Sequence, residues 1–220
     1  MFQREESALM AAEYLLQIKA IKLSPDQPFT WASGLRSPIY CDNRRILSYP
    51  KIRTFVRQEL AKLVTEAFGE ADIIAGVATG GIAHGVLVAQ DLGLPFAYVR
   101  SEAKGHGLTN MIEGMVEEGQ TVIVIEDLVS TGKSSLNAVY ALREAGCRVK
   151  GMASIFSYGL DAALRSFAAA NCQLEPLTDY DTLLRKAIDE RYINDDQLRS
   201  LNEWRINPQQ WSTLRGGPVL

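Results

Sequence analysis

Residues 122–135, which read VIVIEDLVSTGKSS, combine two adjacent carboxylates with a run of small and hydroxyl-bearing residues. Glu126 and Asp127 end an apolar run of strand character, and the small residues come just before a predicted helix. The backbone N–H groups of residues 129–134 and the amino terminus of that helix would form a cradle for a phosphate group. The hydroxyl groups available to this cradle belong to Ser130, Thr131 and Ser134.

The two carboxylates indicate what the phosphate would be attached to. Glu126 and Asp127 suit the hydroxyl groups of a sugar, or a magnesium ion reached directly or through water, because they would repel the phosphate itself. A Ser or Thr N-cap beside acidic residues is the simpler alternative, but it accounts less well for two carboxylates directly after an apolar strand. A P-loop is disfavoured, because a Walker motif needs glycine five residues before Gly132, where the chain has Asp127.

A glycine-rich segment, residues 76–85 (GVATGGIAHG), follows another predicted strand. Its glycines would let the backbone approach a ligand closely, so a diphosphate could rest there. Simple turn chemistry at a strand–helix junction explains the same glycines about equally well. No GxGxxG fingerprint occurs in the segment, so dinucleotide binding is disfavoured.

A third candidate, residues 99–114 (VRSEAKGHGLTNMIEG), gathers Arg100, Lys104 and His106 among small residues. Such a loop could close over an anion and exclude water. A solvated basic loop is the usual alternative, but here the basic residues are confined to one glycine-containing segment before a strand. We expect the other histidine, His84, to be structural.

The elements that must position these loops alternate along the chain. Residues 7–21 and 50–69 have helical periodicity, whereas FTWASGLRSPIYCD predicts short extended pieces joined by a turn. A parallel sheet covered by helices is predicted, because compact apolar runs recur between stretches of helix length. These runs are DIIAGV, PFAYV, TVIVIED and VKGMASIFSY, with a shorter one around CQLEPL. The tail, residues 178–220, reads as charged and helical.

Bulk properties exclude several classes of protein. The 220 residues carry a formal net charge of −3, so no general attraction to nucleic acid is expected. Neither a signal peptide nor a bilayer-spanning segment is predicted, which indicates no membrane association. The three cysteines lack the spacing of a zinc site or disulfide framework, and we therefore expect a cytoplasmic protein.

Taken together, these motifs resemble a known family. VIVIEDLVSTGKSS resembles the ribose-phosphate signature of the type I phosphoribosyltransferases. With FTWASGLRSPIYCDNR and VRSEAKGHG, it is similar to the orotate phosphoribosyltransferases over nearly the whole chain. The resemblance implies an α/β fold, with a parallel sheet flanked by helices and a small amino-terminal hood. It predicts one domain, residues 1–220, divided into an amino-terminal helix and hood (1–45), a core (50–175) and the helical tail (178–220).

The resemblance also implies a reaction and roles for residues. The enzyme would transfer phosphoribose from 5-phosphoribosyl 1-diphosphate (PRPP) to orotate in pyrimidine synthesis, with magnesium held mainly by the substrate diphosphate rather than directly by the protein. Glu126 and Asp127 would bind the ribose hydroxyls, and Ser130 would also contact orotate. Arg100, Lys104 and His106 would reach the diphosphate of the neighbouring subunit, so the resemblance implies a homodimer with shared active sites. The residues around the 5'-phosphate would be Leu128, Val129, Ser130, Thr131, Gly132, Lys133 and Ser134, and those with catalytic roles Lys104, Asp127, Arg100 and His106.

The chain departs from many relatives in its basic residues. It has Ser101 where they have a second basic residue, Ala32 and Gly80 where they have lysines, and no arginine in IFSYGL. We expect Arg36 to compensate for Ala32. A purine phosphoribosyltransferase is the nearer alternative, because the ribose-phosphate turn does not select a base. A non-catalytic regulator on the same fold is a more distant one, since the chain carries no added helix-turn-helix module.

Overall fold

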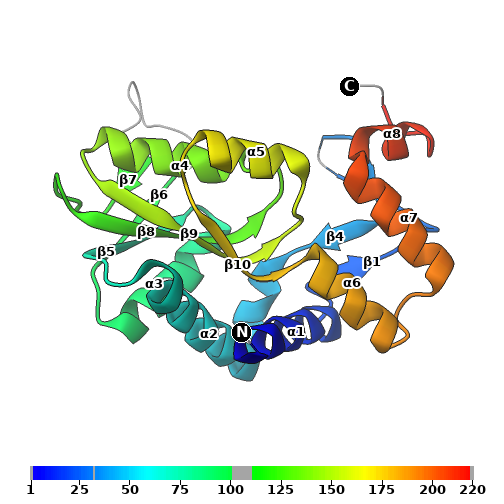
Figure 1. Ribbon diagram of the computed structural model, residues 1–220, viewed down its shortest axis with the longest axis horizontal. Coiled ribbons are helices and arrows are strands. Elements are labelled where there is room, and N and C mark those ends of the chain that lie inside the picture. Colours follow the sequence, from blue (N-terminus) through cyan, green and yellow to red (C-terminus); the bar gives the residue numbers. More distant parts are fainter. Residues whose placement is uncertain (1, 32, 101–110, 219–220) are drawn as a thin grey trace.

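A six-stranded, almost entirely parallel sheet forms the centre of the molecule (Figure 1). The computed structural model describes residues 2–31, 33–100 and 111–218. The strand order is β10-β9-β8-β5-β6-β7, and within this sheet only β7 pairs in the antiparallel sense. The strands are β5 (Ile73–Val77), β6 (Phe96–Val99), β7 (Ile112–Glu113), β8 (Thr121–Val129), β9 (Arg148–Ser157) and β10 (Leu174–Asp179). The predicted parallel sheet is confirmed; β7 was not predicted, since two residues give no periodic signal.

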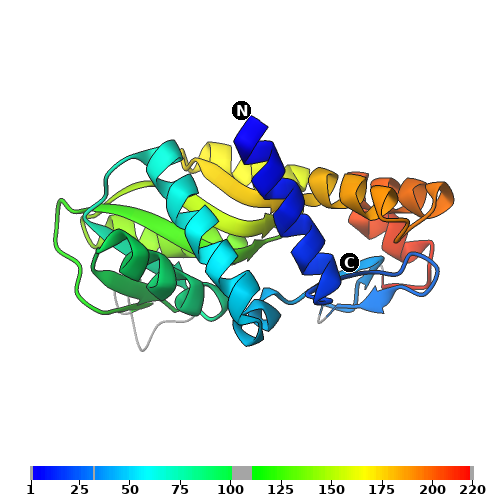
Figure 2. The ribbon, with the colours of Figure 1, turned by 90° about the horizontal axis from the view of Figure 1, so that it is seen from below.

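Helices cover both faces of this sheet (Figures 1 and 2). One apolar cluster joins α4 and α5 to alternate residues of the strands, and a second joins α1, α2 and α3 to the residues between them. The alternation follows from strand geometry, because successive side chains point to opposite faces. The helices are α1 (Phe2–Gln17), α2 (Pro50–Phe68), α3 (Gly80–Leu92), α4 (Lys133–Glu144) and α5 (Asp161–Ala169).

The first helix differs from the prediction at both boundaries, because it begins at Phe2 rather than at residue 7 and ends before residue 21. The first helix ends at Gln17, and Lys19 adopts a left-handed φ of 55° that breaks it. Ile21, predicted to be the last helical residue, instead begins β1 (Ile21–Leu23) and pairs with Cys41 of β4 (Ile39–Cys41). The predicted helix ended one turn too late because Ala20 and Ile21 are buried in the same core cluster as the helix, although they do not belong to it.

Segments of the amino-terminal half and of the tail lie together beside the sheet, at the right of Figure 1. The amino-terminal half contributes β2 (Phe29–Thr30) and β3 (Arg36–Ser37), and the tail contributes α6 (Tyr180–Asp189), α7 (Asp195–Ile206) and α8 (Pro208–Thr213). The 3-10 helix η1 (Asn43–Ser48) instead contacts α2, α3 and β8. The Arg36 amide donates to Ser212 Oγ at 2.9 Å, which ties β3 to α8. The extended pieces and the helical tail were predicted, although α8 was not distinguished from α7 as a separate helix.

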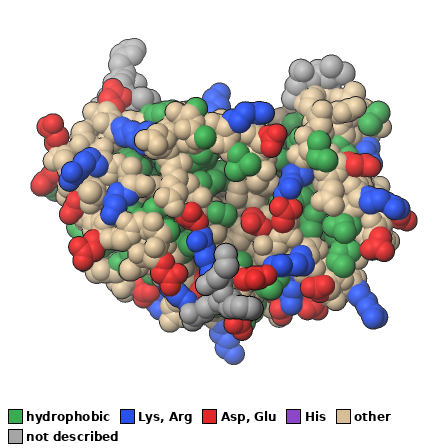
Figure 3. Space-filling view, in the orientation of Figure 1, with side chains coloured by type: hydrophobic (Ala, Val, Ile, Leu, Met, Phe, Trp, Pro, Cys, Tyr) green, Lys and Arg blue, Asp and Glu red, His purple; other side chains and the backbone are tan. Residues whose placement is uncertain are grey.

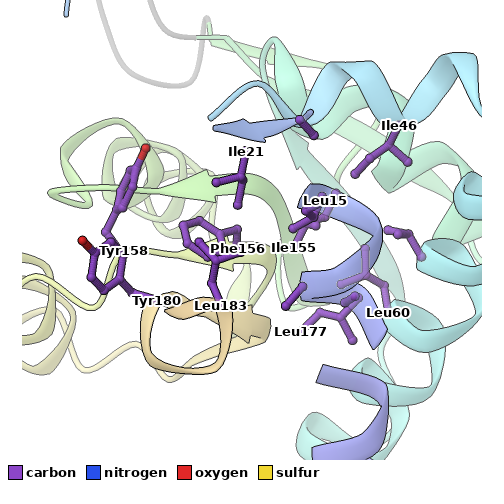
Figure 4. Packing of buried hydrophobic residues seen from close by; sticks show 14 of the residues in the cluster. Leu15, Ile21, Ile46, Leu60, Ile155, Phe156, Tyr158, Leu177, Tyr180 and Leu183 are labelled. Atoms are coloured by element: carbon purple, nitrogen blue, oxygen red, sulfur yellow. The ribbon is translucent and has the colours of Figure 1, made fainter. Parts of the chain in front are cut away.

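Aromatic packing holds this region together. Trp204 is 1% exposed, and its ring lies 5.6–5.7 Å from those of Trp31, Tyr158 and Tyr180, with steep or tilted interplanar angles. Such geometry is favourable for aromatic rings. Figure 4 shows Tyr158 and Tyr180 beside Phe156, at one end of the core that continues to Leu15. The tail therefore shares a core with the amino-terminal segment.

The surface carries charges of both signs, which are interspersed over the face shown in Figure 3. Among the described residues, no helix combines the length and apolar character needed to cross a membrane.

Candidate active site

The acidic pair lies at the carboxyl end of β8, which is an interior strand between β5 and β9. Residues 122–125 are fully buried because both faces of the strand are covered by helices. Glu126 is still 4% exposed, whereas Asp127 is partly open. Ligands of open parallel sheets bind beyond this edge, and the predicted site is therefore in a suitable position.

Glu126 is held by two donors. The Asp127 amide donates to Glu126 Oε1 at 3.0 Å, and the Ser135 hydroxyl donates to Oε2 at 2.9 Å. Burial raises the pKa of the Glu126 carboxyl well above its ordinary value, and the neighbouring Asp127 raises it further, while the Ser135 hydrogen bond lowers it. Sequence reasoning gave no role to Ser135, because spacing alone does not show that its side chain turns back to β8.

Asp127 is the point where two predicted loops meet. A Cβ atom added to Gly80 would lie 2.2 Å from Asp127 Cγ, so the carboxylate rests directly against the glycine-rich segment. The Asn43 amide group donates to the Asp127 carbonyl at 2.6 Å, which fixes the backbone from the hood side. Burial is the main reason that the pKa of Asp127 is raised. Sequence reasoning missed Asn43, which stands in the FTWASGLRSPIYCDNR motif without a distinctive spacing.

The predicted phosphate cradle is a tight turn that ends in a glycine N-cap. Gly132 is the N-cap residue of α4 with φ 82° and ψ −1°, and no side chain caps the helix. A Cβ atom there would lie 2.9 Å from the Phe167 ring, so the position requires glycine. The alternative of a Ser or Thr N-cap is therefore wrong. Within the described part of the chain, no hydrogen bond from the following hydroxyl groups is found: Ser130, Thr131 and Ser134.

The rest of the predicted cradle divides between strand and helix. Leu128 and Val129 belong to β8 and pair with Phe156 and Ser157 of β9. Lys133 is exposed as the first residue of α4. The backbone donors therefore come mainly from the turn and the first turn of the helix, where N–H groups have no intrahelical partner.

The glycines of the glycine-rich segment have two kinds of close neighbour. A Cβ atom at Gly81 would lie 2.5 Å from the Ile125 carbonyl oxygen, and one at Gly85 would lie 2.6 Å from the Phe96 ring. These glycines let α3 pack closely on the sheet, as simple turn and packing chemistry requires. Gly80 is different, because its neighbour is the Asp127 carboxylate. The segment also contains a cis peptide bond between Ala78 and Thr79.

Of the basic loop, only the two ends are described. The Arg100 amide donates to the Met111 carbonyl at 2.8 Å, and Arg100 Nη1 lies 3.6 Å from Glu113 Oε1. Arg100 directly follows β6, at the same edge of the sheet as Asp127. Lys104 and His106 lie outside the described residues, as do Ser101 and Ala32.

Three other positions considered from the sequence, namely Arg36, His84 and the IFSYGL segment, contact or are buried by other parts of the protein. Arg36 Nη1 donates to Thr30 Oγ1 at 2.9 Å, across the β2–β3 pair. His84 is 2% exposed, and burial lowers its pKa to about 4, which keeps the ring neutral at physiological pH. Tyr158, which follows β9 in the IFSYGL segment, is 2% exposed and packs in the aromatic cluster.

Comparison with known proteins identifies the family. The family model "Phosphoribosyl transferase domain" matches residues 43–182, more than half of the chain. The orotate phosphoribosyltransferase of Phocaeicola vulgatus is 54% identical over 200 residues, which cover 91% of this chain and 94% of that protein.

Solved structures agree on the fold. The orotate phosphoribosyltransferase of Aeropyrum pernix superposes with a TM-score of 0.71 at 29% identity, covering 80% of this chain and 96% of that one. That of Mycobacterium tuberculosis, solved in complex with PRPP, has a TM-score of 0.64 at 22% identity, covering 80% and 98%. The predicted type I fold and the predicted transfer of phosphoribose to orotate in pyrimidine biosynthesis are confirmed. The chain belongs to the phosphoribosyltransferase family, as an orotate phosphoribosyltransferase.

Proposed function

We propose that this orotate phosphoribosyltransferase binds PRPP across the junction of the 76–85 and 122–135 segments. The observation that carries the proposal is the contact of the Asp127 carboxylate with Gly80, because it joins the two segments that we expect to hold the ribose and the diphosphate. The 5'-phosphate is bound by backbone N–H groups at the amino terminus of α4 and by the hydroxyls that have no other described partner. Ser130, half-buried after β8, also contacts orotate.

The chemistry that this arrangement must support is cleavage of the anomeric C–O bond. Positive charge develops on the ribose ring and negative charge on the departing diphosphate. Asp127, with Glu126 behind it, faces the ribose, while the fixed N–H groups hold its phosphate so that orotate can attack from a defined direction. Arg100 and the predicted loop groups Lys104 and His106 stabilise the diphosphate and exclude water that would hydrolyse PRPP.

Magnesium fits this donor set as a substrate-borne ion. The described residues include no group of three His, Cys, Asp or Glu side chains able to hold a metal. In this proposal the magnesium ion would take most of its oxygen ligands from the diphosphate and water, and would neutralise charge on the leaving group.

The remaining proposals concern the assembly. A homodimer would bring the loop of one subunit to the cradle of the other, and Arg100 at the carboxyl edge of the sheet is consistent with a loop that starts beside the site. We also propose that residues 1–220 form one domain with the hood, core and tail boundaries predicted above. The shared aromatic core of hood and tail supports the single domain. Three free cysteines favour a reducing, cytoplasmic location.

The site is tested with Asp127→Asn and the control Asp189→Asn, which changes an exposed residue at the end of α6. Diphosphate release is measured with PRPP, magnesium and orotate. Asp127→Asn should lose at least about 100-fold in kcat/KM, whereas the control should keep wild-type activity. Full activity of Asp127→Asn would reject the proposed site. Turnover on adenine or hypoxanthine, but not on orotate, would contradict the base assignment.

The shared site is tested by complementation. Lys104→Ala should lower turnover much more than stability, and equal loss of both would indicate a structural role. When Lys104→Ala chains are mixed with Asp127→Asn chains, the mixture should recover about a quarter of wild-type activity. Random pairing makes about half of the dimers mixed, and each mixed dimer would carry one intact site out of two. Purified heterodimers without activity would exclude a shared site.

A further inference from the structure

We propose that Ser135 is a positioning residue for the reaction: its hydroxyl fixes the Glu126 carboxyl group, and through it the acidic pair that binds the ribose. The proposal rests on the ribose-binding role of Glu126 and Asp127 proposed above. Ser135 is on the first turn of α4 and is 1% exposed, so it does not itself reach the substrate.

The geometry restrains both oxygens of the carboxyl group. Ser135 Oγ lies 2.9 Å from Glu126 Oε2, and the Asp127 amide nitrogen lies 3.0 Å from Oε1. The first donor comes from α4 and the second from β8, so rotation of the carboxyl group breaks at least one hydrogen bond. The same helix turn presents the phosphate cradle, and Ser135 therefore couples the position of the cradle to that of the acidic pair.

The contact is not the usual behaviour of a helical serine. Serine hydroxyls within helices commonly bond to the carbonyl four residues earlier, as Ser166 of α5 does with Ala162 at 2.7 Å. Ser135 instead donates to a side chain on a strand. The contact also stabilises the buried Glu126 carboxyl group, whose burial would be costly without a hydrogen-bond donor.

Burial alone does not create such a contact. Ser154 of β9 is directly paired with Glu126 in the sheet register and is fully buried. Its Oγ nevertheless has no hydrogen-bond partner among the described residues. Ser154 is therefore a matched control: a serine of the same size, also buried, on the strand next to Glu126, but without the hydrogen bond.

The experiment compares Ser135→Ala, Ser135→Thr and Ser154→Ala. In each purified variant, kcat and the KM values for PRPP and orotate are measured, together with thermal unfolding. Ser135→Ala should lower kcat/KM for PRPP about 10- to 100-fold, the range expected when a buried acceptor loses its hydrogen-bond donor, with the KM for orotate changed less than about twofold. Ser135→Thr, which keeps the hydroxyl, should recover most of the loss. Ser154→Ala should match wild type.

Wild-type kcat/KM for PRPP in Ser135→Ala would overturn the proposal. So would equal losses in Ser135→Ala and Ser154→Ala, because they would indicate general sensitivity of the core. Asp127→Asn separates this failure from failure of the site: an inactive Asp127→Asn with a fully active Ser135→Ala rejects only the role of Ser135, whereas full activity of both rejects the site as well.

Discussion

Gly80 and Gly81 are adjacent, yet the structure predicts different consequences for replacing each with alanine. A Cβ atom at Gly80 would lie 2.2–2.3 Å from three atoms of the Asp127 carboxylate. Ordinary van der Waals contact begins at 3.4 Å, so the carboxylate would have to move by about 1.2 Å. At Gly81 the Cβ atom would instead lie 2.5 Å from the Ile125 carbonyl oxygen, which belongs to a central strand.

The two expected losses differ because a side chain must move in Gly80→Ala, whereas backbone must move in Gly81→Ala. A 1 Å misplacement of a reacting group can cost about 100-fold in rate, which corresponds to about 2.7 kcal/mol of transition-state stabilisation. Gly80→Ala should therefore lose about 100-fold in kcat/KM for PRPP with little loss of stability, because a side chain can rotate away. Gly81→Ala should lower the free energy of unfolding by about 1–3 kcal/mol, because backbone must move.

Both variants are assayed for orotate-dependent diphosphate release and for urea unfolding. The informative quantity is the ratio of activity lost to stability lost, which should be high for Gly80→Ala and low for Gly81→Ala. Wild-type kcat/KM in a folded Gly80→Ala protein would refute the reasoning, because it would mean that Asp127 either moves without cost or does not contribute.

Three further outcomes are expected. Burial disfavours protonation of His84 in the folded protein, so the stability that the neutral ring contributes is complete above pH 6.5 and is lost as the pH falls toward 4. When the pH is lowered from about 7.5 to about 5, urea unfolding should show that the free energy of unfolding falls by about 2 kcal/mol more in wild type than in His84→Gln. In Gly132→Ala, the alanine would have to adopt a left-handed φ, and its Cβ atom would clash with Phe167. Calorimetry should show that the free energy of unfolding falls by more than about 1 kcal/mol. Trp204→Ala removes a buried ring from the hood core and should cost about 3–5 kcal/mol in chemical denaturation, whereas a loss below about 1 kcal/mol would contradict the shared core of hood and tail.

The sheet could be predicted because local sequence carried its signal. Buried parallel strands need continuous apolar runs, and four such runs matched β5, β6, β8 and β9. The turn between β8 and α4 could also be predicted, since small residues follow a buried strand there and precede a helix, which brings backbone N–H groups together at the helix amino terminus. The two-residue strand β7 and the end of α1 were missed because tertiary pairing, rather than periodicity, decides them.

Contacts within the site could not be predicted, because they depend on how separate elements pack against one another in space. Asn43 and Asp127 are separated by 84 positions, and their hydrogen bond depends on how the hood approaches the sheet edge. Ser135 is close in sequence to Glu126, but their contact depends on the angle at which α4 returns over β8. Only the structure distinguished Gly80, which faces a carboxylate, from Gly81 and Gly85, which permit packing.

Burial also separates the roles of two carboxylates that are equivalent in the sequence. Glu126 has one donor on each oxygen and almost no exposed surface, whereas the partly open Asp127 faces the glycine-rich segment. A group that must respond to a ligand needs access to it, and one that must stay fixed needs hydrogen bonds from rigid elements. The geometry therefore favours Asp127 as the main ribose contact and Glu126 as the group that holds it in place. On this basis Asp127→Asn should act chiefly on PRPP turnover, while loss of Ser135 should reproduce part of that effect without touching the substrate.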